Sequence, residues 1–321
     1  MNKRDFLRLL ASVPVGWAGT AGAQPAGKQI RFLIPFPPGG SPDVLARKLA
    51  IELAPILGHA PLTENRPGAS GIIAADAAAK AAPDGTTMVL STGSTMAIVP
   101  QVMKKLPYDP GKDLAPVIQV GTTPFVVLVN AADPARNIQD LLARARSGQV
   151  SFGSFGNGTT THLIGETINL AAKTRMLHVP YRGTGPAITD LIGGQVTAVI
   201  TDLGTARPHL EGRLRALGVT GSRRNPAVPQ IPTFGEQGLP SLDPLVSWIG
   251  FFAPGATPRP LLEKLANDIG RGLRTDTMRS EIAAVGYEPT GLALDAFGEV
   301  VRSDFVRWKN VIDALGPISL S

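Results

Sequence analysis

The stretch that decides the fold is residues 31–50, RFLIPFPPGGSPDVLARKLA. Residues 31–35 carry one charge followed by apolar side chains and predict a buried strand, which the Pro-Pro-Gly-Gly run ends. Ser41 then stands at the expected helix N-cap, followed by a proline and by Asp43 in the first turn. Leucines and alanines at helical spacing over 45–53 predict one buried helix face. A glycine loop that leads into a helix N-terminus presents unpaired N–H groups and the positive end of the helix dipole, so we expect an anion there.

A second segment repeats this order in the other half of the chain. Residues 151–172, SFGSFGNGTTTHLIGETINLAA, predict a strand, a glycine-rich loop and a helix with Thr159 or Thr160 as its cap. One such loop alone is typical of an ordinary strand-to-helix turn. Two of them in separate halves indicate a cleft that closes on a ligand from both sides.

The composition is that of a soluble globular protein. The 321 residues are 43% hydrophobic and 17% charged, which is enough for two domains with cores of their own. The aromatic share of 5% argues against a nucleic-acid binder that stacks bases. Charges of both signs are interspersed without a long basic run, so we expect neither a nucleic-acid nor a membrane-surface partner.

Residues 1–23 predict a secretory signal peptide cleaved after Ala23. Basic side chains precede an apolar stretch at 9–18, and small residues fill positions 21–23. The apolar run is shorter than the roughly 20 residues that a bilayer requires. Its removal takes away three positive charges and one negative charge, which lowers the net charge from +6 to +4. The pair Lys3-Arg4 leaves the twin-arginine route open, and we favour the general secretion route.

The chain contains no cysteine. This excludes a disulfide, a thiolate metal site, a cysteine nucleophile and a lipid-modified N-terminal cysteine. An exported chain without a lipid is expected to be a free protein of the periplasm in a Gram-negative cell. We expect the mature chain to be a monomer that does not insert into the membrane.

Strand-like and helix-like segments alternate along the mature chain, and among them an alanine-rich helix is expected to run from Ser70 to about Ala82. This alternation predicts an α/β fold of mostly parallel sheets flanked by helices. The apolar segments 125–130 and 246–253 are interpreted as two crossings between domains. Domain 1 is then discontinuous, residues 24–124 and 251–321, and domain 2 is residues 125–250. Ligands of such folds bind between the domains, at the carboxyl ends of the strands.

Four further residues leave alternatives open. Arg182 is either a clamp for a carboxylate or a surface residue, and we favour the surface. Asp202 follows a predicted strand and either accepts a hydrogen bond from a ligand or caps the next segment. His162 and Glu166 have the four-residue spacing of metal ligands but lack a third ligand, so we expect no metal site. His162 is more simply explained by a hydrogen bond to the loop backbone.

Signatures of catalysis and of cofactor binding are missing from the sequence. Residues 39–43 fail the G-x-S-x-G pattern at its last position, and the chain has no G-x-x-x-x-G-K-[ST] loop. Residues 156–158 lack the third glycine of a dinucleotide fingerprint. The sequence therefore predicts a binding protein without a cofactor. The alternative is an enzyme that acts on a small carboxylate with Asp43, His162 or Asp202.

Five blocks in order resemble one protein family over essentially the whole mature chain. They are PFPPGGSPDVLAR, ENRPGASGIIAADAAAKAAPDGTTMVLST, GNGTTTHLIGE, VPYRGTGPAITDLIGGQV and GFFAPGATP. The family is the Bug family of periplasmic solute-binding proteins, also called the tripartite tricarboxylate transporter receptor (TctC-like) family. The resemblance implies a two-domain periplasmic-binding-protein fold of type II, the Venus flytrap. It also implies a small carboxylate ligand, delivered to a membrane permease or to the ectodomain of a sensor kinase.

The resemblance further implies that loops 36–43 and 154–160 hold the ligand from opposite domains, largely through backbone groups and bridging water. Asp202 is placed at the cleft by the same argument. Position 41–42 is variable in the family, and Phe155 replaces a residue that is commonly smaller, so the identity of the acid is not carried over. The residues assigned to ligand binding are Phe36, Gly39, Gly40, Ser41, Asp43, Ser94, Ser154, Gly156, Asn157, Gly158, Thr159, Thr160 and Asp202.

Overall fold

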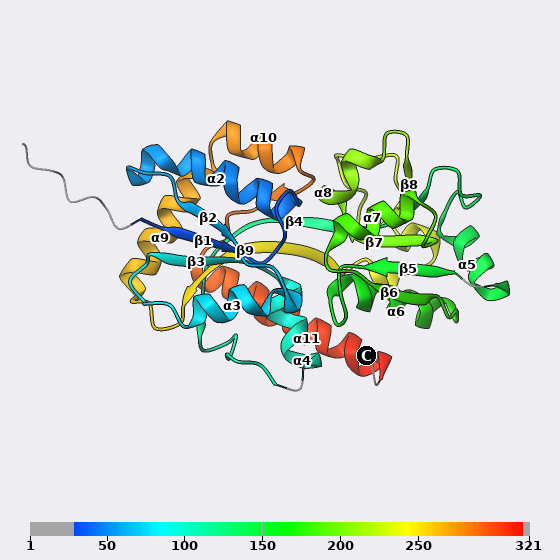
Figure 1. The fold of residues 1–321 in the computed structure, drawn as a ribbon, viewed down its shortest axis with the longest axis horizontal. Helices are drawn as coiled ribbons and strands as arrows, with labels where there is room; N and C mark the ends of the chain where they lie inside the picture. Colours follow the sequence, from blue (N-terminus) through cyan, green and yellow to red (C-terminus); the bar gives the residue numbers. More distant parts are fainter. Residues whose placement is uncertain (1–28, 104, 149, 317–321) are drawn as a thin grey trace, which may run out of the picture.

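The computed structural model describes residues 29–103, 105–148 and 150–316. The predicted signal peptide and its cleavage after Ala23 lie outside these residues. Two lobes lie side by side, one built from the beginning and the end of the chain and the other from its middle (Figure 1). The long strand β4 runs from one lobe into the other, and β9 lies beside its first half.

The first lobe begins with alternating strands and helices. They are β1 (Arg31–Ile34), α2 (Ser41–Leu57), β2 (Leu62–Asn65), the short turn η1 (Ala69–Gly71), α3 (Ile72–Ala79), β3 (Thr87–Thr92), the π-helical turn η2 (Ser94–Ile98) and α4 (Val99–Val102). The chain returns to this lobe after visiting the second one. The returning elements are β9 (Val246–Pro254), α9 (Arg259–Leu273), α10 (Asp276–Ala284), β10 (Glu288–Pro289) and α11 (Leu294–Leu315).

The second lobe also alternates strands and helices, and β4 (Leu114–Asn130) leads into it. Its elements are α5 (Ile138–Ser147), β5 (Ser151–Ser154), α6 (Thr160–Ala172), β6 (Leu177–Pro180), α7 (Thr184–Ile192), β7 (Ala198–Asp202), α8 (Leu203–Ala206), η3 (Arg207–His209), β8 (Leu214–Val219), η4 (Gly235–Gln237) and η5 (Pro240–Leu242).

One continuous sheet path joins both lobes in the order β2-β1-β3-β9-β4-β7-β5-β6, with β8 and β10 also paired to β4. The outer strands are parallel, as the α/β prediction requires, whereas β4 and β9 are antiparallel to their neighbours. β4 pairs with β9 up to Pro124 and with β7 from Phe125 onward. The strand predicted at 125–130 is therefore the second half of a longer strand. The proposed domain limits stay a prediction, and this change of partners favours the one at 125.

The strand register determines where a ligand can meet the fold. β7 ends at Asp202, which lies opposite Phe125 of β4, and β5 runs parallel to β7. In the first lobe β3 ends at Thr92 opposite Ile249 of β9, and β1 runs parallel to β3. The carboxyl ends of the parallel strands in both lobes thus point at the boundary between the lobes, where such folds bind ligands.

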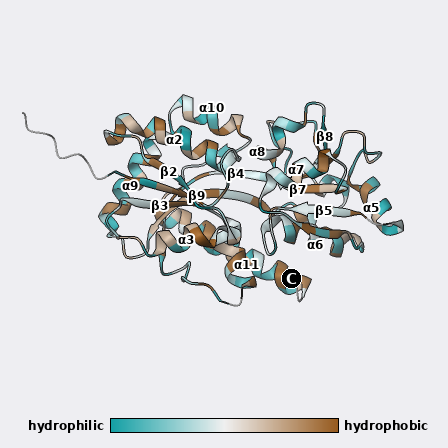
Figure 2. Cartoon of the chain, in the orientation of Figure 1, coloured by the Kyte–Doolittle hydropathy of each residue, from teal (hydrophilic) through white to brown (hydrophobic). Residues whose placement is uncertain are grey.

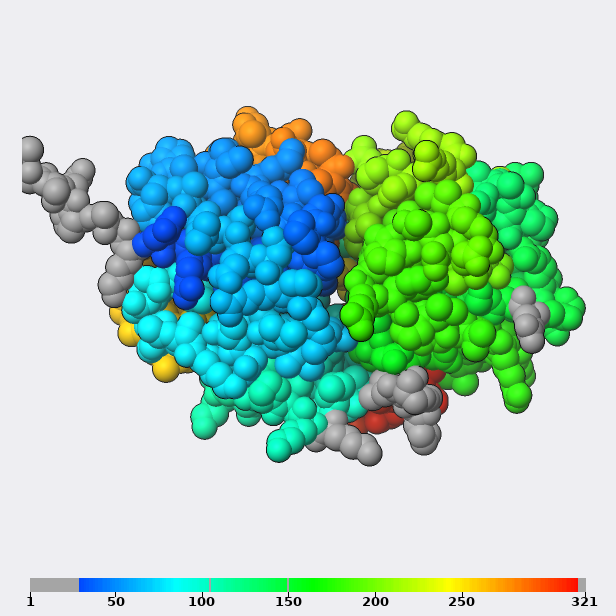
Figure 3. Space-filling model, in the orientation of Figure 1, coloured from blue at the N-terminus to red at the C-terminus, as the bar shows by residue number. Residues whose placement is uncertain are grey.

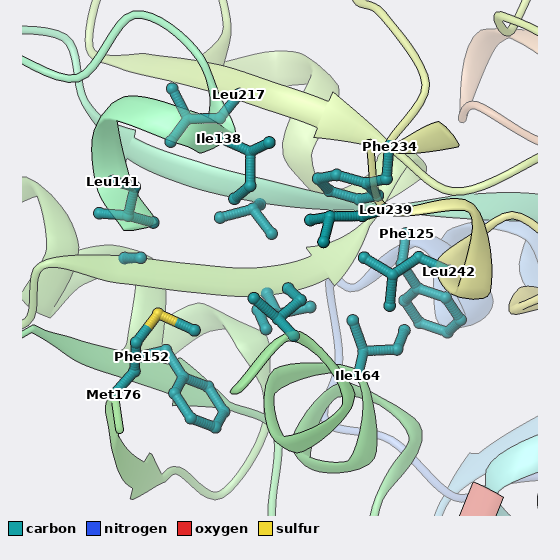
Figure 4. Packing of buried hydrophobic residues seen from close by; sticks show 14 of the residues in the cluster. Phe125, Ile138, Leu141, Phe152, Ile164, Met176, Leu217, Phe234, Leu239 and Leu242 are labelled. Atoms are coloured by element: carbon teal, nitrogen blue, oxygen red, sulfur yellow. The ribbon is translucent and has the colours of Figure 1, made fainter. Parts of the chain in front are cut away.

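Each lobe has its own apolar core. The predicted stripe of α2 is confirmed, because Leu45, Leu49 and Leu53 are at most 1% exposed and pack with residues of α9 and α10. In the second lobe Phe152 of β5 and Ile164 of α6 pack in one cluster with side chains from the loop after β8 (Figure 4). Hydrophilic and hydrophobic residues alternate along most of the helices (Figure 2).

Two helix starts differ from the sequence prediction. α3 begins at Ile72 and not at Ser70, because Ser70 (φ 54°) and Gly71 (φ 91°) have left-handed backbone that an α-helix cannot include. The N-cap of α2 is Gly40 and not Ser41, because Gly40 has the extended backbone of a cap and Ser41 is already helical. Thr159 does occupy the predicted N-cap position of α6.

Helix α11 connects the lobes on one side and carries a buried acid. It contacts η2 in the first lobe and α6 in the second, and it runs beneath both in Figure 1. Asp304 is 1% exposed and accepts hydrogen bonds from Trp248 Nε1 (2.9 Å) and Arg307 Nη1 (2.8 Å). Burial raises the pKa of Asp304 to about 6, against the lowering effect of these two donors.

Asp304→Asn is expected to change how stability depends on pH. The native state keeps the proton of Asp304 up to about pH 6, whereas the unfolded chain releases it near the ordinary pKa of 3.8. The native state thus binds more protons in this window, and the contribution of Asp304 to the free energy of unfolding falls as pH rises. The expected fall over the whole window is about 3 kcal/mol, at about 1.4 kcal/mol per pKa unit. Urea unfolding from pH 4 to pH 7 should show the variant gaining stability relative to wild type; parallel curves would contradict this.

Candidate ligand-binding site

The first loop, residues 36–40, is folded back onto α2 by Asp43. Gly39 has a φ of 89°, which favours glycine, and its N–H donates to Asp43 Oδ2 at 2.9 Å. Asp43 Oδ1 accepts from Arg47 Nε (3.0 Å) and Asn65 Nδ2 (2.8 Å). Burial raises the pKa of Asp43, but these hydrogen bonds outweigh it and the pKa lies below its ordinary value. Asp43 is thus an ionised support of the loop, with both oxygens occupied.

Ser41 reaches across to the second lobe. Its Oγ donates to Asp202 Oδ1 at 3.1 Å and lies 3.3 Å from Thr205 Oγ1. Asp202 is the N-cap of α8 and accepts from Thr205 N (2.9 Å) and Thr205 Oγ1 (2.8 Å). Of the two roles considered for Asp202, the structure shows the cap, and it adds a hydrogen bond between the lobes that the sequence did not reveal. The hydroxyl of Ser41, which was predicted to cap α2, therefore bonds to the opposite lobe and does not cap its own helix.

The second loop, residues 155–159, is supported from below by its own helix. Gly158 has a φ of 65°, and its N–H donates to His162 Nδ1 at 3.1 Å, which confirms the predicted bond between His162 and the loop backbone. Gly156 donates to Ser154 Oγ at 3.2 Å. Thr159 Oγ1 donates to the carbonyl of Gly156 (2.7 Å) and accepts no capping hydrogen bond. Thr160 is buried in the first turn of α6.

A stacked histidine pair lies under this loop. The rings of His162 and His178 are 3.8 Å apart and 10° from parallel, and His178 Nε2 lies 2.7 Å from Ser154 Oγ. Burial lowers the pKa of His162 to about 4, and burial together with the nearby His162 lowers that of His178 to about 3. Both rings are therefore neutral at neutral pH. No local signal in the sequence reveals this partner of His162, because the position of His178 depends on β6 lying beside β5, with His178 opposite Phe152.

The lobes approach one another at three places around the two loops. Besides Ser41 and Asp202, Ser70 Oγ donates to the carbonyl of Asn157 at 3.4 Å. Pro37 of the first loop lies close to Gly183, which follows β6. In the space-filling view the surfaces of the two lobes face each other across a narrow seam at this level (Figure 3). The first turns of α2 and α6, whose leading N–H groups lie outside the helical hydrogen-bond ladder, face this seam from opposite sides.

Ser94 adds a buried polar group to the same region. It begins η2 directly after β3, is 6% exposed, and its Oγ has no hydrogen-bond partner among the described residues. Its neighbour Thr95 donates from Oγ1 to the carbonyl of Ser70 (3.1 Å), the residue that contacts the second loop. A buried hydroxyl without a partner costs free energy, so Ser94 Oγ keeps an unused capacity for a hydrogen bond.

Comparison with known proteins identifies the family to which this architecture belongs. Residues 45–317 match the model of the tripartite tricarboxylate transporter family receptor. The chain belongs to this receptor family. BugT of Bordetella pertussis is 34% identical over 322 residues, with 97% of this chain and 98% of BugT covered.

Two solved structures of similar receptors carry ligands. Rpa4515 from R. palustris, with adipate, superposes with a TM-score of 0.85 at 32% identity, covering 90% of this chain and 97% of that one. MatC from Rhodopseudomonas palustris, with bound malate, gives a TM-score of 0.81 at 30% identity and covers 88% and 98%. Like its relatives, the present chain is a solute-binding receptor in fold.

The remaining candidates of the sequence do not form a separate site in this receptor. Arg182 is exposed, as the surface interpretation expects. Glu166 Oε1 lies 4.0 Å from His162 Nε2, and burial raises the pKa of Glu166. The described part of the chain holds no group of three side chains suited to a metal ion. Nor does it include a helix both long and apolar enough to cross a bilayer.

Proposed function

We propose that this receptor binds a small carboxylate between its two lobes in the periplasm and delivers it to a tripartite tricarboxylate-type transporter or to a sensor. The observation that carries the proposal is the pair of glycine loops at the starts of α2 and α6, which face each other from opposite lobes. Adipate and malate in two related receptors support the same ligand class.

The physical chemistry of the two loops suits a carboxylate. A hydrogen bond to a charged group contributes about 1.5–3 kcal/mol, and a favourable helix end contributes about 0.3–2 kcal/mol. Several such contributions reach about −8 kcal/mol, which is the micromolar range. The two lobes would separate about the crossings, and the ligand would select the closed arrangement by contacting both loops at once.

The geometry does not favour the alternative of an enzyme. Asp43 and Asp202 are occupied by hydrogen bonds that shape their own segments, and His162 accepts from Gly158. Ser154 and His178 form a hydroxyl–imidazole pair, but Ser154 is 0% exposed and does not reach the seam as a nucleophile.

Native mass spectrometry of the protein as purified tests the proposed function, because the seam would retain a tight ligand. Refolded protein is then titrated with a series of mono- and dicarboxylates, including adipate and malate, by calorimetry. We expect at least one acid to bind in the micromolar range. The absence of any carboxylate that binds better than about millimolar would contradict the proposal. A pull-down with and without the acid then distinguishes a transporter partner from a sensor partner.

Gly40→Val is expected to weaken binding of that acid by at least about tenfold, or about 1.4 kcal/mol, with little change in stability. A Cβ at Gly40 would meet no atom closer than 3.8 Å and its φ of −72° suits any residue, so the fold tolerates the substitution. The added isopropyl group would instead occupy the room that the ligand needs beside the backbone. Gly111→Val, in an exposed loop of the same lobe, is the control. Normal binding by Gly40→Val would remove the first loop from the site.

A further inference from the structure

The backbone N–H groups of Gly156 and Gly158, on either side of Asn157, are both connected by hydrogen bonds to the stacked histidines. Gly158 N–H donates to His162 Nδ1 directly, at 3.1 Å. Gly156 N–H donates to Ser154 Oγ at 3.2 Å, and Ser154 Oγ lies 2.7 Å from His178 Nε2. The imidazole pair thus holds the backbone of the second loop at two points, one on each side of its tip.

Thr159 and Thr161 also bind this loop, at the Gly156 carbonyl (2.7 Å) and at Phe155 N–H (3.2 Å), but neither bond reaches the N–H of Gly156 or Gly158. Gly156 and Gly158 have φ angles of 145° and 65°, which side-chain-bearing residues rarely adopt, so the segment has the freedom of a glycine loop. The support beneath it is rigid by contrast. His162 is 3% exposed, its ring stacks on His178, and Phe152 of β5 lies 5.1 Å below His178. The glycine loop thus lies on a packed aromatic base.

We propose that the His162–His178 stack is the positioning element of the second loop, holding residues 155–159 in the shape that directs the first-turn N–H groups of α6 at the ligand. This inference rests on the proposed function for its consequence in binding. His162 reaches the loop at Gly158 N–H and His178 reaches it through Ser154 Oγ, so both rings act on a ligand through the loop. The role requires an unprotonated Nδ1 on His162, with the ring proton on Nε2, which lies 4.0 Å from Glu166 Oε1.

Paired substitutions at position 162 test the role. His162→Asn retains an acceptor, the side-chain carbonyl oxygen, at about the place of Nδ1, whereas His162→Leu fills the same apolar space without an acceptor. With adipate as the probe, we expect His162→Leu to bind at least about tenfold more weakly than wild type and His162→Asn within about threefold. His209→Asn, in η3, is the matched control and should bind normally. Equal binding by the leucine and asparagine variants overturns the proposal, whichever level they share.

Amide hydrogen exchange separates this inference from the proposed function, because it needs no ligand. In the ligand-free protein, His162→Leu should speed exchange at Gly156 and Gly158 by about tenfold or more, and His162→Asn should not. If no acid binds to wild type, the proposed function fails, while the exchange rates still decide the positioning role. Unchanged exchange in His162→Leu overturns it.

A measurement on the wild-type protein tests the proposal even if a variant fails to fold. Nitrogen-15 chemical shifts of the imidazoles report which ring nitrogen carries the proton. We expect His162 to be neutral, with Nδ1 unprotonated, at pH 7 and at pH 6. A proton on Nδ1 at pH 7 would leave no acceptor for Gly158 and would overturn the proposal.

Discussion

Gly204→Ala is expected to abolish tight ligand binding while each lobe stays folded. Gly204 lies in α8 of the second lobe, and a Cβ there would stand 2.1 Å from the carbonyl oxygen of Val285 in the first lobe. It would also stand 3.3 Å from Cβ of Ser41. Real Cβ contacts are essentially never shorter than 3.0 Å. The backbone of Val285 therefore has to move, and the movement separates two segments that belong to opposite lobes.

The position of this contact makes a small displacement effective. Thr123 Oγ1, next to the point where β4 changes partners, donates to the carbonyl of Gly286 at 2.8 Å. Arg207, which follows α8, donates from Nη1 to the carbonyls of Ala283 (2.9 Å) and Ala284 (3.1 Å) at the end of α10. A methyl group added at position 204, this close to the point where β4 passes between the lobes, is expected to change the angle between them. The gap then widens toward the ligand loops and breaks the hydrogen bond between Ser41 and Asp202.

The expected loss of affinity for the acid identified on wild type is at least about a hundredfold, or about 2.7 kcal/mol. Calorimetry measures it, and small-angle scattering should show the variant more extended than wild type when the acid is present. Gly148→Ala is the matched control, since a Cβ there meets nothing closer than 3.7 Å at the far end of the same lobe. A Gly204→Ala protein that binds like the control would show that the lobes need not approach here.

How much of this could be predicted depends on whether a feature is local in sequence. The strand, loop and helix around Ser41 follow from turn chemistry and helical spacing, and the structure confirms them with a shift of one residue at the cap. The buried stripe of α2 follows in the same way. These features are encoded by neighbours within a few positions, where propensity and periodicity act.

The connections between the lobes were not predictable by the same reasoning. Ser41 was expected to cap its own helix, but its hydroxyl bonds to Asp202, 161 positions away. The neighbouring sequence does not distinguish a serine that caps its own helix from one whose hydroxyl bonds to the other lobe. His178 likewise has its partners on β5 and α6, and only the pairing of β6 with β5 brings them together. The assignment of the individual residues to ligand binding remains a prediction for the experiments above.

The buried histidines are expected to make the receptor unstable in acid. Their pKa values in the native state, about 4 for His162 and about 3 for His178, lie below the ordinary value of 6.5. Below pH 6.5 the unfolded chain therefore binds protons at these histidines that the native state does not bind. Stability is lost as pH falls from about 6.5 toward 4, the opposite direction to the effect of Asp304.

The loss is on the order of 4 kcal/mol for the pair, at about 1.4 kcal/mol per pKa unit and reduced by solvent screening. This is a large part of the 5–15 kcal/mol by which domains are typically stable, given as a rough range. Glu166, 4.0 Å from His162, offsets part of this loss of stability when ionised.

The decisive comparison is urea unfolding of wild type and of the double variant His162→Asn/His178→Gln at steps from pH 7 to pH 4. Asp304 and the other acids titrate in both proteins, so their contributions cancel in the difference. We expect the variant to be less stable at pH 7 but to lose much less as pH falls, so that the two curves converge. Two curves with the same slope would mean that the rings titrate alike in the native and unfolded states, which their burial beneath the second loop does not permit.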